Sequence, residues 1–269
     1  MTGRFLLTML CATTIWGQTS LERGKRVITE ALAALGGDRF LAMEDRVETG
    51  RMYSFYREEL SGLSQAAIYT QYLPAAGAGP DSLAVRERQS FGKMGKDGLK
   101  EISAVLFADG RGHEITFRGA RPLPDDSLER YKSTTYHNVF YILRVRLNEP
   151  GMTFEGKGLD VWMNQPVEVV DIVDARNDVV TVYFHGSTKL PVRQLYYRRD
   201  PKTNVRIEEV TEYGKYRDAG GGVQWPYTLL RTRDKEKIFE MFSETVEINR
   251  KLSGSLFVLP TGIKVLKKL

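Results

Sequence analysis

Thiols and imidazoles are scarce in this chain. Cys11 is the only cysteine among 269 residues, and there are three histidines. A single thiol cannot form an intramolecular disulfide, and a structural zinc site needs several thiolate or imidazole ligands. None of the histidines stands in a His-Glu-x-x-His pair, which is the pattern of zinc hydrolases. The sequence therefore predicts no metal site and no cofactor.

Long apolar runs are also missing, because no run reaches the roughly 18 residues that a membrane-spanning helix needs. The longest, FLLTMLCATTIW, follows Arg4 and ends just before Gly17. A basic start, a short apolar stretch and a small residue are typical of a secretory leader. We predict a signal peptide over residues 1–17, cleaved after Gly17, and a periplasmic or secreted product; the alternative is a buried N-terminal helix. Cys11 would be lost with the leader.

The chain has no strong excess of charge of one sign. The net charge is +5, and acidic residues alternate with basic ones along most of the sequence. Nucleic-acid binding needs clustered positive charge, so no nucleic-acid partner is predicted.

Patterns that carry catalytic chemistry are absent as well. There is no Gly-x-Ser-x-Gly motif. Gly110-Arg111-Gly112 joins two predicted strands and opens no helix, so it indicates a turn rather than a phosphate site. Glu208 and Glu209 are adjacent on a predicted strand and point to opposite faces. No catalytic residue is predicted, and a hydrolase using His137 or His185 is the least favoured reading.

Two stretches have a helical period. The first is 20–37, with Ser20 as the expected cap and Gly36-Gly37 as a left-handed stop, followed by one possible turn over 38–43. The second begins at Asp125-Asp126, which we expect to cap it, and continues to Leu147 ahead of Pro150 as one long helix.

The rest of the chain alternates with period two, which is typical of half-buried strands. The predicted strands are Arg46–Tyr56, Ala66–Tyr72, Val85–Phe91, Ala104–Phe107, Glu114–Arg118, Met152–Lys157, Val167–Asp174, Val179–His185, Leu190–Tyr197, Val205–Tyr216, Val223–Leu230 and Ile238–Ile248. Short turns separate most of them, so neighbouring strands should be antiparallel. Residues 74–82, PAAGAGPDS, are a longer loop.

Each strand presents one apolar face. In HGSTKLPVRQLYY, residues 185–197, the chain turns at Ser187-Thr188-Lys189 and resumes its alternation at Leu190, with Pro191 at the strand start. Residues 223, 225, 227 and 229 should share one face, as should 238, 242, 246 and 248. A wide antiparallel sheet with one apolar face needs a cover, and the two helices are available for it. The expected fold class is α+β, with a single domain over residues 18–269.

Three stretches resemble the LolA/LolB-like lipoprotein-carrier superfamily, which includes outer-membrane lipoprotein-sorting proteins. They are ALAALGGDRFLAM running into Glu48-Thr49-Gly50, the hairpin VTVYFHGSTKLPVRQLYY, and YGKYRDAGGGVQWPYTL followed by Val246-Glu247-Ile248-Asn249 and LFVLP. The resemblance spans about Ser20 to Pro260 and matches poorly between Gly77 and Pro124. It implies a large curved sheet, an unclosed β-barrel, with helices covering its concave face.

The resemblance also implies a non-enzymatic carrier or chaperone that holds a lipid acyl chain or a lipoprotein between sheet and helices, with envelope proteins as further partners and a monomeric state. The residues that alternation and helical period place in such an apolar cavity are Val180, Val182, Phe184, Trp225, Tyr227, Leu229, Phe242, Phe140 and Leu143. These side chains fit a plain filled core equally well. In that case the protein is a cell-envelope interaction module, with residues 74–124 as its contact region.

Overall fold

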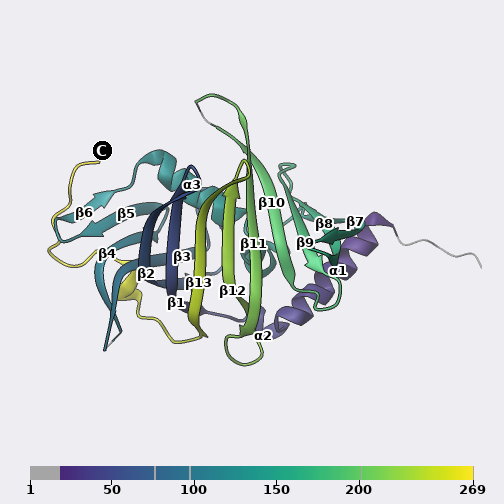
Figure 1. Ribbon diagram of the computed structural model, residues 1–269, viewed down its shortest axis with the longest axis horizontal. Helices are drawn as coiled ribbons and strands as arrows, with labels where there is room; N and C mark the ends of the chain where they lie inside the picture. The colour runs from purple at the N-terminus through teal and green to yellow at the C-terminus, as the bar shows by residue number, and fades with distance from the viewer. Residues whose placement is uncertain (1–18, 76, 97, 201, 269) are drawn as a thin grey trace, which may run out of the picture.

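The computed structural model describes residues 19–75, 77–96, 98–200 and 202–268, and it is dominated by one antiparallel sheet of 13 strands (Figure 1). The strands are β1 (Asp45–Tyr56), β2 (Glu59–Tyr72), β3 (Val85–Gly95), β4 (Gly98–Ala108), β5 (Arg111–Thr116), β6 (Gly119–Pro122), β7 (Thr153–Trp162), β8 (Gln165–Val173), β9 (Val179–His185), β10 (Pro191–Arg199), β11 (Arg206–Asp218), β12 (Gln224–Arg233) and β13 (Glu236–Ile248). Every predicted strand has its counterpart. Only β6, which has four residues, was not predicted.

The strand order shows how the two halves of the chain form one sheet. It runs β6-β5-β4-β3-β2-β1-β13-β12-β11-β10-β9-β8-β7, so the first and last strands of the chain pair in the middle. β6 and β7 form the two ends of this order and do not pair with each other, so the barrel is unclosed, as predicted. The C-terminal tail lies along β6, where the Ala120 amide donates to the Lys264 carbonyl and the Leu266 amide donates to the Ala120 carbonyl.

The N-terminal helix α1 (Ser20–Leu35) lies along the β7–β8 side of the sheet (Figure 1). Its cap is Thr19 rather than the predicted Ser20, because the Thr19 hydroxyl accepts from the Glu22 amide and the Glu22 carboxylate accepts from the Thr19 amide. The helix ends at Gly36 with φ 120°, the predicted left-handed stop. A single turn, α2 (Asp38–Leu41), follows.

The predicted long helix over 125–147 is instead three short pieces: α3 (Asp125–Tyr136), α4 (Val139–Tyr141) and the π-helical turn η1 (Ile142–Arg146). We call residues 125–146 the central helical segment. It breaks at Asn138, whose backbone is extended and whose side chain accepts from the amides of Phe140 and Tyr141 at 3.0 and 3.4 Å. The expected Asp125-Asp126 cap is also wrong, because the residue at the cap is Pro124 and no side chain caps α3.

The main core lies between the inner face of the sheet and α1, α4 and η1. A smaller cluster lies on the other face of β4 and β5, where the C-terminal segment around η2 (Gly254–Phe257) packs Phe257 against Ala104, Leu106 and Ile115. The helices therefore cover the concave face, and the C-terminal tail covers part of the outer face.

A β-bulge in β13 changes which side chains face the core. Thr49 pairs with Thr245, but Gly50 pairs with Ser243, so Glu244 is an extra residue. The extra residue reverses the alternation. Met241 is consequently buried with 3% exposure, whereas Phe242 lies outside the core with its ring edge-on to Tyr53 at 5.8 Å. The prediction that Phe242 shares a face with Val246 is therefore wrong.

Within the described residues, no helix is long and apolar enough to cross a membrane. The predicted signal peptide, with Cys11 and the cleavage after Gly17, lies outside the described residues.

Candidate functional site

Most of the predicted cavity residues come together on the inner face. They form part of one buried cluster, and Leu229 packs against its edge. From the sheet the cluster takes Val180, Val182, Phe184, Trp225 and Tyr227, and from the central helical segment Phe140 and Leu143. Phe242 is the one candidate that lies elsewhere.

Phe140 is the central contact between the helical segment and the sheet. Its ring lies 4.6 Å from the ring of Trp225 and 5.1 Å, edge-on, from the ring of Tyr213. Leu143 and Val139 are fully buried beside it. An aromatic contact of this kind contributes about 0.5–1.5 kcal/mol beyond the burial of apolar area. These three side chains therefore lie between the central helical segment and the inner face of the sheet.

The break in the helical segment is held by a buried amide on β10. Gln194 is 1% exposed, and its Nε2 donates to the His137 carbonyl at 3.1 Å. Its Oε1 accepts from the Val139 amide at 2.7 Å and from the Tyr213 hydroxyl at 2.8 Å. Asn138 Nδ2 donates to the same tyrosine at 3.2 Å. Gln194 thus satisfies the donor and acceptor that the break leaves free.

Three further hydrogen bonds, made by two side chains, tie the segment to loops at the edge of the core. The Arg144 guanidinium donates to the Met43 carbonyl at 3.0 and 2.6 Å. The Ala84 amide donates to the Tyr141 hydroxyl at 2.9 Å. Both partners are backbone groups next to the sheet, so these bonds fix where the segment sits without filling the core.

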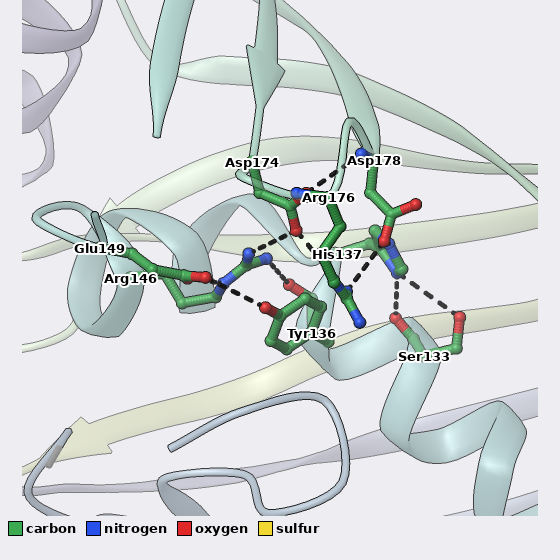
Figure 2. A network of polar contacts seen from close by, with 8 residues as sticks. All are labelled: Ser133, Tyr136, His137, Arg146, Glu149, Asp174, Arg176 and Asp178. Atoms are coloured by element: carbon green, nitrogen blue, oxygen red, sulfur yellow. Dashed lines mark hydrogen bonds and ion pairs between the residues drawn. The ribbon is translucent and has the colours of Figure 1, made fainter. Parts of the chain in front are cut away.

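A charged network holds the C-terminal end of the segment (Figure 2). Arg146 is 5% exposed; its guanidinium donates to the Tyr136 carbonyl at 3.0 Å, to Glu149 at 2.6 Å and to Asp174 at 2.9 Å. The last contact reaches the turn between β8 and β9. The ring of Tyr136 stacks on the same guanidinium at 3.4 Å, and burial raises the pKa of this tyrosine to about 12.

His137 occupies the break itself. Its ring stacks on Tyr196 of β10 at 4.4 Å, and its Nδ1 donates to the Ser133 carbonyl at 2.7 Å. The Nε2 lies 3.9 Å from Asp178, and this imidazole, followed by Arg176, holds the pKa of Asp178 below its usual value (Figure 2). The Ser133 hydroxyl also lies 3.4 Å from the same Nδ1, so these contacts tie the end of α3 to β10 and to the turn between β8 and β9.

Two hollows lie away from this cluster. One of about 20 Å³ lies between α3 and the β4–β5 turn, lined by Phe107, Leu128 and Tyr131 among others. Another of about 250 Å³ lies at the β5–β6 hairpin beside Leu266. Neither is lined by a predicted cavity residue.

Next to the apolar cluster, the inner face becomes polar. Arg46 of β1 lies over the Trp225 ring at 4.2 Å, and Glu48 lies 3.5 Å from its Nε. Glu87 of β3 follows across the sheet, and Arg231 of β12 also faces inward beside Thr211. Burial raises the pKa of Glu87, and the charges of Arg46 and Arg231 offset only part of that rise.

Sequence reasoning missed the polar residues of this site. Gln194 stands at an inward position of the predicted strand 190–197, where alternation calls for an apolar side chain. Arg146 interrupts the apolar spacing of the predicted helix in a similar way. A polar residue at a position where the pattern requires an apolar one is therefore the signal that could have identified both.

The geometry defines a class of protein: an unclosed antiparallel barrel with helices packed on its inner face. No protein-family model and no curated protein matches the chain. Solved structures do match. An outer membrane lipoprotein-sorting protein domain from Vibrio parahaemolyticus superposes with a TM-score of 0.55 at 14% identity, over 88% of this chain and 97% of that one.

A LolA superfamily protein from Nitrosomonas europaea gives a TM-score of 0.52 at 8% identity, over 87% of this chain and 97% of that one. A DUF1329 family protein from Desulfovibrio piger gives 0.51 at 10% identity, over 90% and 98%. The chain therefore has a LolA-like fold, as the three quoted stretches predicted.

Proposed function

We propose that this protein is an exported, non-enzymatic carrier that takes up the acyl chain of a lipid or lipoprotein between the sheet and the central helical segment. The proposal rests on how the inner face of the sheet is covered. Beside the continuous helix α1, the wide apolar inner face is covered by three short helical pieces that polar contacts hold at several points.

The arrangement allows the cover to be exchanged for a ligand. Phe140, Leu143 and Val139 occupy the inner face in the closed form, and an acyl chain would replace them against Trp225 and Phe184. Burial of apolar surface contributes about 25 cal/mol per Å² for either occupant. The hydrogen bonds at Gln194, Arg144 and Arg146 would hold the segment closed when no ligand is present.

The LolA-like fold supports the proposal, because two of the similar solved structures are described as a lipoprotein-sorting domain and a LolA superfamily protein. The signal peptide over residues 1–17, the cut after Gly17, the single domain over 18–269, the monomeric state and the absence of catalytic activity remain predictions of the same proposal.

Native mass spectrometry of gently purified protein tests it, with uptake of a fluorescent fatty acid as the second measurement. We expect co-purifying lipid or saturable uptake. A uniformly ligand-free protein that takes up no fatty acid would contradict carriage.

A second candidate, an envelope interaction module, is favoured by the filled core, because none of the predicted cavity residues lines either hollow. Here the sheet is a scaffold, and residues 74–124 make the contact. Deleting the PAAGAGP loop should then abolish capture of a partner while leaving lipid uptake unchanged.

A further inference from the structure

Arg231 is an unpaired cation on the inner face of the sheet. It pairs across the sheet with Thr211, which is 5% exposed, and its guanidinium lies over the ring of Phe239 at 5.6 Å. Its Nε is buried without a hydrogen-bond partner, and the guanidinium makes no ion pair within the described part of the chain. Arg231 as a whole is half-buried, but a buried donor without a partner is unfavourable, so the position of this Nε needs a reason.

The neighbouring arginines show that the acidic residue nearby is already used. Arg233, two residues further along β12, and Arg198 of β10 both bind Glu209 Oε1 at 2.9 Å. This carboxylate therefore serves two guanidiniums that are not Arg231.

A second guanidinium, Arg46, also has an unused donor. It is 9% exposed and makes long hydrogen bonds to Thr70 at 3.2 Å and to Tyr72 at 3.4 Å. Its Nε is buried without a hydrogen bond, because Glu48 at 3.5 Å is not aligned with it and instead accepts from Ser243. Arg46 also lies over Trp225, so it marks the boundary between the polar and the apolar parts of the inner face.

Arg46 lies opposite Ile248 of β13, whereas Arg231 lies opposite Phe239 of the same strand, so the two arginines mark different ends of the inner face. Glu87 lies in the row of Arg46, because Thr70 pairs with both. Glu87 accepts from Gln89 at 2.6 Å and from Thr70 at 3.4 Å. Burial raises its pKa, so its charge is disfavoured there. Glu48 lies 3.5 Å from Arg46, whereas no carboxylate of the described residues lies within ion-pair distance of Arg231.

We propose that Arg231 binds the acidic headgroup of an amphiphilic ligand, a phosphate or a carboxylate, while the acyl chain lies along the inner face of β12 towards Trp225. Guanidiniums suit this role because their paired donors match the oxygens of phosphate and carboxylate. The inference rests on the proposed carrier function and adds to it a preference for anionic over neutral lipids.

The test compares three probes: dioctanoyl phosphatidic acid, dioctanoylglycerol with the same chains and no charge, and glycerol 3-phosphate as the headgroup alone. Binding is read from displacement of an uncharged naphthylamine fluorophore and from calorimetry. The wild type should bind phosphatidic acid about tenfold or more tightly than dioctanoylglycerol, as a charge-assisted hydrogen bond predicts.

Arg231→Gln should remove that preference, and Arg231→Lys should keep part of it. The control is Arg193→Gln. Arg193 also has a buried Nε without a hydrogen bond, but it lies over Tyr183 on the opposite face from Gln194. Thermal unfolding of Arg231→Gln should be no easier than that of the wild type, because the variant loses an unpaired charge and no ion pair.

Each outcome separates the two proposals. Equal binding of the charged and uncharged lipids in the wild type and in Arg231→Gln would overturn the headgroup site and leave carriage intact. Binding of glycerol 3-phosphate without either lipid would support an anion site for a free phosphate and refute carriage. No binding of any probe would overturn both.

Discussion

Replacing Gln194 by leucine should open the central helical segment. Gln194 satisfies three groups: the Val139 amide, the His137 carbonyl and the Tyr213 hydroxyl. Leucine is of similar size and cannot bond to any of them. Tyr213 still accepts from Asn138, but its own O–H loses its acceptor, so two buried backbone groups and one hydroxyl lose their partner.

Each unsatisfied buried group costs about 1–3 kcal/mol, so the closed form should lose roughly 3–9 kcal/mol. A domain of ordinary stability has about 5–15 kcal/mol in total, so the sheet should survive while the segment detaches. Hydrogen exchange should show lost protection over 137–146 with β9–β12 still protected. Uptake of a fluorescent fatty acid should become faster.

Gln224→Leu is the matched control, because Gln224 makes no hydrogen bond through its side chain within the described residues. Unchanged exchange over 137–146 in Gln194→Leu would refute the role given to this amide. Lost protection without faster uptake would show that the segment is part of a fixed core and would favour the interaction module.

Three further predictions concern single sites. Arg146→Met leaves the buried Asp174 with only the exposed Arg176, at 3.6 Å, as a cation, and chemical denaturation should show a loss of about 3–5 kcal/mol; a loss below about 1 kcal/mol would contradict the buried network in Figure 2. Phe242→Ala should destabilise less than Met241→Ala, for which about 2–5 kcal/mol is expected, and the reverse order would show that the β13 bulge is misplaced. Glu87→Gln should stabilise the protein increasingly as pH rises from 4.5, the ordinary pKa of glutamate. The raised pKa of the folded state means that the wild type loses stability as pH rises through it, so a melting-temperature difference that does not grow with pH would count against this prediction.

The sequence predicts the strands well because each one is half-buried, and alternation is the direct consequence of that burial. It misses β6 because four residues are too few for a period to be visible. It misplaces Phe242 because one extra residue, Glu244, reverses the alternation, and a bulge of this kind leaves no signal in a count of apolar spacings.

The broken helix was unpredictable for another reason. Residues 125–147 have helical spacing, but the amide and carbonyl at the break are satisfied by Gln194, more than 50 residues further along the chain. The tertiary contact with Gln194 therefore outweighs the local helix propensity. The same holds for the candidate site. Its apolar residues were predicted from their period, whereas the positions of Arg46, Arg231 and Arg146 follow from contacts between distant parts of the chain.

Whether this fold carries a ligand depends on how the free energy of the closed form compares with that of a form that holds an acyl chain. Fully burying an apolar side chain such as Phe140, Leu143 or Val139 contributes about 1.5–3 kcal/mol, so the central helical segment gains roughly 5–9 kcal/mol from these three. An acyl chain gains about 0.8 kcal/mol per buried methylene, so about ten methylenes would match them. Because the apolar terms nearly cancel, the polar contacts determine the outcome: the bonds of Gln194 and Arg146 favour the closed form, and an anion at Arg231 favours the loaded one.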